Sequence, residues 1–211
     1  MGVSSAKENI LKKIRQALTH PAPVPFPQSE GNTNVFQPSL KELEIEFAEN
    51  FTGLLGRFSF CENEQELVAQ ISLLQASHKL KSIFCNEAVL RNKLSASGFS
   101  CNYSTELSAC HASITTCESL VARTGSILLS SAAESGRTAS VYAPIHICVA
   151  YTSQLVYDIK DSLQLIKEKY RGKLPSVISL ATGPSRTADI EKTLVVGVHG
   201  PKEVYVFLVE D

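Results

Sequence analysis

The amino-acid sequence predicts an α/β protein with a mainly parallel sheet that helices cover on both faces. Short β-like runs alternate with helical patterns from residue 39 onward, which is typical of right-handed strand–helix–strand crossovers. The runs are rich in Ile, Val and Leu, as expected for strands buried on both faces. With 211 residues, the chain is long enough for one main core, or one core with a small appendage.

The first segment predicts a short amphipathic helix followed by a linker. Ser5 and Glu8 have the spacing of a capping box, and apolar side chains recur behind them at helical spacing. These side chains are Ile10, Leu11, Ile14, Ala17 and Leu18. Five prolines between residues 21 and 38 then exclude both helix and regular strand. We therefore expect an N-terminal helix and Pro-rich linker over residues 1–38, and one α/β domain over residues 39–211.

The α/β domain is expected to open with a helix, because Ser39 and Glu42 have the spacing of a second capping box. Its apolar stripe consists of Leu40, Leu43, Phe47, Phe51 and Leu54. Three further helices are expected. One begins at Asn63, and one lies between the second and third strands, where Gly98 can end it in a left-handed conformation. The last covers residues 156–170. Strands are expected at residues 57–61, 81–85, 99–103, 126–131, 145–150, 176–181, 193–198 and 203–209.

Charge and hydropathy argue against two classes of partner. The chain has 20 Lys and Arg against 21 Asp and Glu, so it offers no broad basic field for a nucleic-acid backbone. No apolar run approaches the roughly 20 residues that a membrane span needs. The N-terminus alternates apolar and charged residues, unlike a signal peptide. We therefore expect a cytoplasmic protein with no membrane span and no nucleic-acid partner.

The six cysteines are expected to be thiols, because a chain of this size without a secretion signal belongs in a reducing compartment. No pair has the C-x-x-C spacing typical of a zinc site or an iron–sulfur cluster. Cys61, Cys85 and Cys148 lie in apolar runs, where a thiol packs as a small buried hydrophobe. No metal site is predicted.

Residues 182–191 form the most informative polar segment. It follows a predicted strand through a Gly183-Pro184 turn, and ligands in open α/β sheets gather beyond the carboxyl ends of strands. Arg186 can hold a carboxylate or phosphate in a bidentate manner, and the Ser185 hydroxyl can donate to the same anion. In the alternative interpretation, Asp189 caps a short helix, Arg186 pairs with an acid, and the hydroxyls only satisfy the turn. The nucleotide-binding patterns G-x-G-x-x-G and G-x-x-x-x-G-K-[ST] are absent from the sequence.

Three other segments carry candidate ligand-binding residues. His199 and Gly200 lie between two predicted strands, where the imidazole can transfer a proton, although a plain hairpin turn with a solvated histidine is the alternative. Thr124-Gly125-Ser126 and Arg137 can bring hydroxyls and a cation to one sheet edge, or can simply be turns. His146 enters an apolar strand, where a hydrogen-bonded structural histidine is the simpler interpretation.

Taken together, these segments resemble the LUD domain of lactate-utilization proteins. The phrases are GPSRTADIE at residues 183–191, VGVHGP at 196–201, ARTGSILL at 122–129, and SGR followed by YAPIHICVA between 135 and 150. The resemblance spans roughly residues 39–209, and the overall layout resembles the lactate utilization protein C group within that family. Its most specific part is the C-terminal third of the chain.

The resemblance implies an α/β/α sandwich similar to the ribose-phosphate isomerase, glucosamine-phosphate isomerase and CoA-transferase group. It also implies conversion of L-lactate to pyruvate together with partner proteins that carry iron–sulfur clusters. The chain lacks the ferredoxin-like Cys-rich region of larger relatives, so we expect it to bind no cluster itself. Arg123 stands where many relatives carry an acid, so a role that depends on that acid does not carry over. The motif residues carried over are Thr124, Gly125, Ser126, Arg137, His146, Gly183, Ser185, Arg186, Asp189, Glu191, His199 and Gly200.

Three hypotheses follow for function. The first is an accessory subunit of an L-lactate oxidation system that docks against iron–sulfur oxidoreductase subunits and binds a small anionic ligand. In this hypothesis Arg186 and Ser185 anchor the ligand, Asp189 and Glu191 orient the loop or accept hydrogen bonds, and His199 donates a proton. The second is a stand-alone enzyme acting on a phosphorylated sugar, a folate or a CoA thioester, which rests on fold analogy. The third is an interaction module whose polar loops are structural.

Overall fold

The computed structural model describes residues 5–19, 41–188 and 194–211, and the chain divides into two compact units, Met1–Gln37 and Pro38–Asp211. The first unit contains helix α1 (Ser5–Leu18), which confirms the expected N-terminal helix. Its Ile10, Leu11 and Ile14 side chains are exposed. The Pro-rich segment and Ser39 lie outside the described residues.

The second unit is built on a six-stranded parallel sheet, which confirms the predicted fold class. Its strand order is β1-β12-β7-β4-β2-β3, and each neighbouring pair is parallel. The strands are β1 (Arg57–Cys61), β12 (Glu203–Val209), β7 (Ile145–Tyr151), β4 (Ala112–Thr115), β2 (Ile83–Phe84) and β3 (Tyr103–Ser104). The expected bounds hold for β1 and β12, and β2 is shorter than expected. β3 shares only Tyr103 with the strand expected at residues 99–103.

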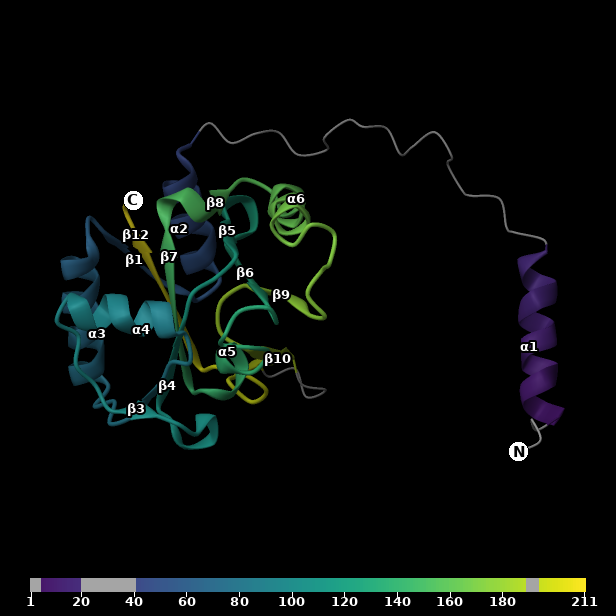
Figure 1. Cartoon of the computed structure of the whole chain (residues 1–211), viewed down its shortest axis with the longest axis horizontal. Helices are drawn as coiled ribbons and strands as arrows, with labels where there is room; N and C mark the ends of the chain where they lie inside the picture. Colours follow the sequence, from purple (N-terminus) through teal and green to yellow (C-terminus); the bar gives the residue numbers. More distant parts are fainter. Residues whose placement is uncertain (1–4, 20–40, 189–193) are drawn as a thin grey trace. The chain divides into compact units, whose positions relative to one another are not determined.

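Both faces of this sheet are buried, as expected from its apolar runs. Alternate residues of β12 point to opposite faces, so Phe207 packs in one hydrophobic cluster and Val206 in the other. Helices α3 (Glu64–Ser77) and α4 (Ala88–Ala96) cover the first face, and α2 (Leu43–Gly53) covers the second with Phe47 and Phe51. Figure 1 shows these helices on the two sides of the sheet.

Four strands form a second sheet, which corrects the expectation that the two predicted among them, β6 and β9, continue the parallel pattern. Its order is β8-β5-β6-β9, and the β5–β6 and β6–β9 pairs are antiparallel. The strands are β8 (Leu155–Val156), β5 (Ser119–Val121), β6 (Ser126–Ser130) and β9 (Ile178–Ala181). The connection between β5 and β6 is too short for a parallel crossover, and Gly125 turns the chain with a φ of 57°. β10 (Arg186–Ala188) and β11 (Leu194–Val196) form a separate antiparallel pair.

Helix boundaries follow local capping in some places and depart from expectation in others. The side chain of Asn63 accepts from the Glu66 N–H and begins α3, and Gly98 adopts a φ of 94° after α4, as expected. Helix α2 begins at Leu43 with Glu42 as its N-cap and without a side-chain cap, so Glu42 is not inside the helix as the expected capping box requires; Ser39 lies outside the described residues. The predicted 156–170 helix is α6 (Ile159–Lys169), which Asp158 caps, and α5 (Ala139–Tyr142) is a single turn.

Two further expectations concern free cysteine thiols and membrane-spanning helices. All six cysteines are free, and Cys61, Cys85 and Cys148 are buried as expected. None of the helices in the described ranges combines the length and apolar character that crossing a bilayer requires.

Candidate functional site

Two of the predicted segments meet in the structure around Ser185. Its N–H donates to the Pro201 carbonyl at 2.9 Å, and its carbonyl accepts from the Gly197 N–H at 2.8 Å. A Cβ on Gly200 would lie 2.9 Å from the Ser185 Cβ, so the glycine permits this close approach. The turn that carries His199 is therefore held directly against the Ser185 backbone.

This turn lines a pocket of about 430 Å³, which we call the loop pocket. Its lining residues are Val141, Tyr142, Pro144, Gly197, Val198, His199, Gly200 and Lys202. His199 and Lys202 are exposed, and so is Arg186 on the neighbouring strand β10. Asp189 and Glu191, predicted as catalytic, lie outside the described residues. The loop pocket thus combines an imidazole and an ammonium group beside the predicted Ser185.

A second group of predicted residues joins β6 to the end of β9. The Ser126 hydroxyl lies 2.8 Å from the Thr124 hydroxyl and 2.9 Å from that of Thr182. Gly125 and Gly183 pack against α2 and the turn after it. A Cβ on Gly125 would lie 2.5 Å from the Phe51 backbone nitrogen, and one on Gly183 would collide with the Leu54 carbonyl oxygen. The structure therefore gives both glycines a packing role.

Arg137 and His146 have other partners. The Arg137 guanidinium donates to the Ser176 hydroxyl at 2.6 Å. His146 is fully buried in β7 with its Nε2 2.9 Å from the Thr115 hydroxyl, and burial lowers the pKa of its imidazole to about 4. Its Nδ1 has no hydrogen-bond partner among the described atoms. These contacts support the structural interpretation of His146.

The predicted location of the polar loop is wrong. Residues 182–191 were expected beyond the carboxyl end of a strand in the parallel sheet, but β9 belongs to the second, mixed sheet. Pro144 and Lys202 precede β7 and β12, so the loop pocket lies at the amino ends of the central parallel strands. The opposite edge of that sheet carries a different pocket.

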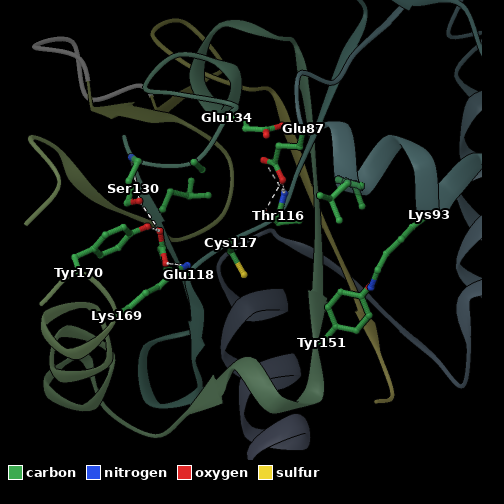
Figure 2. A pocket seen from close by; sticks show the side chains of 15 residues that line it. Glu87, Lys93, Thr116, Cys117, Glu118, Ser130, Glu134, Tyr151, Lys169 and Tyr170 are labelled. Atoms are coloured by element: carbon green, nitrogen blue, oxygen red, sulfur yellow. Dashed lines mark hydrogen bonds and ion pairs between the residues drawn. The ribbon is translucent and has the colours of Figure 1, made fainter.

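This second pocket, the carboxyl-edge pocket, has a volume of about 430 Å³. Its wall includes Glu87 after β2, Thr116 after β4 and Tyr151 at the end of β7. The next strand of this sheet after β2 is β3, on one side of β2, whereas the next strand of this sheet after β4 is β7, on the opposite side. Such a reversal of strand order is a switch point, where α/β sheets bind ligands. Its residues are Glu87, Val89, Leu90, Lys93, Thr116, Cys117, Glu118, Leu129, Ser130, Ala132, Ala133, Glu134, Tyr151, Lys169 and Tyr170 (Figure 2).

Glu87 and Thr116 connect the two strand ends across this switch point. Glu87 is 7% exposed, and its carboxylate accepts from the Thr116 N–H at 3.1 Å and from the Thr116 hydroxyl at 2.6 Å. Next to it, the Glu134 carboxylate accepts from the Ala88 N–H at 2.7 Å, at the beginning of α4. Two carboxylates thus occupy backbone donors at this edge of the sheet.

Glu118 is the third carboxylate, with a side chain only 6% exposed. It accepts from the Ser130 hydroxyl at 2.5 Å, the Tyr170 hydroxyl at 2.7 Å and the Lys169 ammonium at 2.8 Å, as Figure 2 shows. Burial raises the pKa of this carboxyl, but the hydrogen bonds from Lys169, Ser130 and Tyr170 outweigh burial. The pKa of Glu118 therefore lies below its ordinary value, and the group is an anion at neutral pH.

The remaining wall carries a phenol and a thiol. The Tyr151 hydroxyl accepts from the Lys93 ammonium at 2.9 Å and donates to Glu64 at 3.0 Å, and burial raises the pKa of Tyr151. Cys117 faces the pocket, and its hydrogen bond with Cys148, together with burial, raises the pKa of the Cys148 thiol well above its ordinary value. In the described part of the chain, no group of three or more His, Cys, Asp or Glu residues is arranged to hold a metal ion.

The carboxyl-edge pocket was not predicted from the sequence, because no strand was expected at β4 or β5. The segment between these strands supplies Thr116, Cys117 and Glu118. The available signal was the β-branched run Ile114-Thr115-Thr116, which an acid follows before the next apolar run. None of the predicted site residues that the structure describes lines this pocket.

Comparisons with known proteins identify the family. The LUD domain family model matches residues 45–209, which is most of the chain. The chain belongs to the LUD domain family. The resemblance found in the sequence is therefore confirmed. A crystal structure of a DUF162 family protein from Deinococcus radiodurans has a TM-score of 0.59 and 20% identity to this LUD-domain chain, covering 79% of it and 96% of the solved chain. That likeness supports the fold alone.

Curated relatives of this LUD-domain chain align over less than half of its length. Lactate utilization protein C of Bacillus licheniformis is 37% identical over 100 residues, which are 46% of this chain and 42% of that protein. Lactate utilization protein C of Bacillus subtilis is 36% identical over 100 residues, with the same coverage. The uncharacterized protein NMB1437 of Neisseria meningitidis is 36% identical over 89 residues, 42% of this chain and 38% of that protein. The aligned part of the chain spans about two fifths of the length of these relatives.

Proposed function

We propose that this LUD-domain chain is a cytoplasmic accessory subunit of a system that oxidises L-lactate to pyruvate. The observation that carries the proposal is the 34–37% identity to several proteins named lactate utilization protein C. In this proposal the chain binds no cofactor itself and docks against oxidoreductase subunits that carry iron–sulfur clusters. The family match over residues 45–209 supports a shared role, because it covers the whole folded α/β unit rather than one motif.

The proposal places a small anionic ligand at the loop pocket. Lys202 and His199 line the pocket, and the Ser185 backbone is bonded to the same turn at Gly197 and Pro201. An ammonium group at the pocket wall, and the Ser185 hydroxyl beside Gly200, are suited to a carboxylate of the size of lactate. Arg186 is exposed on β10 and can add a bidentate contact. Thr124, Gly125, Ser126, Arg137, His146, Gly183 and Gly200 then shape and support the surrounding loops.

His199, Asp189 and Glu191 have the proton-handling and orienting roles in this proposal. His199 is the candidate proton donor, because its exposed imidazole lies at the pocket wall. Asp189 and Glu191 follow Arg186 closely in the sequence, so they can accept hydrogen bonds from it or orient its loop.

A deletion experiment tests the cellular role. Removing the gene should abolish growth on L-lactate and leave growth on pyruvate intact, and the wild-type gene supplied in trans should restore it. Pull-down of the tagged chain from lactate-grown cells should recover iron–sulfur proteins. Normal growth on L-lactate, in a strain with no second copy, would contradict the proposal.

Point variants test the loop pocket within the same strain. Ser185→Ala and Lys202→Ala should each fail to restore growth on L-lactate although the purified variants unfold at the wild-type temperature. His111→Gln serves as the matched control, because His111 is exposed and does not line the loop pocket. If the loop variants restore growth as well as His111→Gln does, the anion site lies elsewhere.

A stand-alone enzyme acting on a phosphorylated sugar, a folate or a CoA thioester is the second candidate. The switch-point position of the carboxyl-edge pocket favours an enzyme, whereas its buried carboxylates disfavour the phosphate and carboxylate groups of these substrates. Turnover of one of these substrates by the purified chain, without any partner protein, would support this candidate over the accessory role.

A further inference from the structure

In the carboxyl-edge pocket, two carboxylates of the protein already occupy backbone N–H groups that an anionic ligand would use. In α/β folds the first N–H groups of a helix at this edge form a natural anion site. Here the Glu134 carboxylate accepts from the Ala88 N–H at 2.7 Å, and the Glu87 carboxylate accepts from the Thr116 N–H at 3.1 Å. A small carboxylate ligand would have to displace these groups or approach them against like charge.

The buried charges of this pocket are negative and its positive charges are exposed. Glu87 is 7% exposed and the Glu118 side chain 6%, whereas the side chains of Lys93 and Lys169 are 47% and 61% exposed. Both ammonium groups also have carboxylate partners, Glu64 at 3.5 Å and Glu118 at 2.8 Å. Water screens exposed charges far more than buried ones, so the interior of the pocket favours a positive group.

The pocket retains acceptor atoms for a ligand and has apolar walls. Glu134 uses its Oε2 for the Ala88 bond, which leaves its Oε1 available to a donor at the pocket rim. Leu90, Leu129 and Ala133 supply apolar surface between the carboxylates. A volume of about 430 Å³ accommodates a ring-sized body. Figure 2 shows Glu134 and Glu87 at one end of the pocket and Tyr170 and Glu118 at another.

We propose that the carboxyl-edge pocket binds an organic molecule with an apolar, ring-sized body and a cationic or N–H-rich head group. The head group donates to Glu87 and Glu134, and the body packs on Leu90, Leu129 and Ala133. The pocket discriminates against carboxylates, including lactate. It is therefore a second site, separated from the loop pocket by the length of β7, which is roughly 20 Å for seven extended residues. This inference is independent of the lactate-utilization proposal.

Benzamidine and benzoate are matched probes for this pocket, because they share a ring and differ in the charge of the head group. Titrated into the purified full-length chain and followed by amide NMR, benzamidine should shift the resonances of Ala88, Thr116 and Cys117. Its affinity should be about tenfold higher than that of benzoate, the ratio that one charge-assisted hydrogen bond supports. Equal or tighter binding of benzoate, or no binding of benzamidine, would overturn the proposal.

Three variants locate the binding. Glu134→Gln keeps an acceptor for the Ala88 N–H and removes the charge, so benzamidine affinity should fall about tenfold. Ala133→Phe should abolish binding by filling the pocket. Glu106→Gln, an exposed acid outside the pocket, should leave binding unchanged. If benzamidine binds Glu134→Gln and Ala133→Phe as it binds the wild type, it occupies another site and the proposal fails. Growth on lactate is not part of this readout, so the two proposals stand or fall separately.

Discussion

The carboxylate of Glu87 accepts hydrogen bonds from both the backbone N–H and the hydroxyl of Thr116, which lies 29 positions further along the chain. The two residues follow β2 and β4, which are neighbours in the parallel sheet but are separated in sequence by α4 and β3. The contact therefore fixes the two strand ends that border the carboxyl-edge pocket. Because Glu87 is 7% exposed, its carboxylate oxygens need these hydrogen-bond partners in place of water.

Thr116→Val should lower the free energy of unfolding by about 1–3 kcal/mol, the usual cost of leaving a buried carboxylate short of a partner. Thr116→Ser should retain most of the stability, since it keeps the hydroxyl that donates at 2.6 Å. Urea unfolding at pH 7 measures both, with Thr105→Val in an exposed position as control. An equal loss in the Ser and Val variants would mean that the hydroxyl contributes nothing.

Glu118→Gln should destabilise the protein at neutral pH and much less in acid. The folded carboxyl has a pKa below its ordinary value of 4.5, because hydrogen bonds from Lys169, Ser130 and Tyr170 outweigh burial. A lowered folded pKa contributes stability above the unfolded pKa, and that stability is lost as the pH falls through the folded pKa.

The expected difference in unfolding free energy between wild type and Glu118→Gln is about 1–3 kcal/mol at pH 7. It should shrink as the pH falls below 4.5. Urea unfolding between pH 7 and pH 3 measures it, and Glu106→Gln, which is exposed, should show no such trend. A difference that stays constant over this range would contradict a role for the Glu118 charge.

The central sheet was predictable where the local sequence has a strand pattern. β12 has the expected bounds because its run of Val, Phe and Leu is buried on both faces, whereas β1 has them although only Cys61 of its five residues is buried. β4 was not predicted, although all four of its residues are buried, since two of them are polar. The Ser113 hydroxyl donates to the Ala139 carbonyl at 2.6 Å, and Thr115 bonds His146 at 2.9 Å. Those partners are distant in sequence, so local patterns cannot reveal that the polar groups are satisfied.

The site was less predictable than the sheet for the same reason. The meeting of Ser185 with Gly197 and Pro201 follows from motifs that lie close in sequence. The carboxyl-edge pocket instead requires the strand order, because Glu87 and Glu118 approach one another only when β2 and β4 are neighbours. The turn at Gly125 also reverses the chain so that β6 pairs antiparallel with β5, which no periodicity signals.

The variants Gly125→Ala and Gly136→Ala distinguish two costs of adding a side chain, backbone strain and collision with neighbouring atoms. Both glycines have positive φ, at 57° and 66°, but a Cβ at Gly136 meets no atom within 4 Å. A Cβ at Gly125 would lie 2.5 Å from the Phe51 backbone nitrogen. We expect Gly136→Ala to cost about 1–2 kcal/mol from conformation alone, and Gly125→Ala to cost clearly more. Thermal unfolding measures both, and equal losses would exclude the packing role of Gly125.

His146 should make the protein less stable as the pH falls from 6.5 to about 4. Burial lowers the pKa of its imidazole from the ordinary 6.5 to about 4. Between these values the unfolded chain binds a proton that the folded chain does not, so the free energy of unfolding falls as the pH decreases. Above 6.5 this contribution is fully present, and below about 4 it changes no further.

The expected loss across this window is about 3 kcal/mol, since one unit of pKa difference corresponds to about 1.4 kcal/mol. His146→Gln keeps a polar group near the Thr115 hydroxyl but cannot titrate, so its stability should fall less steeply between pH 6.5 and pH 4. Thr105→Val, which changes an exposed position without a titrating group, should follow the wild-type curve. Urea unfolding at several pH values gives all three slopes. Parallel curves for wild type and His146→Gln would contradict the lowered pKa of the buried imidazole.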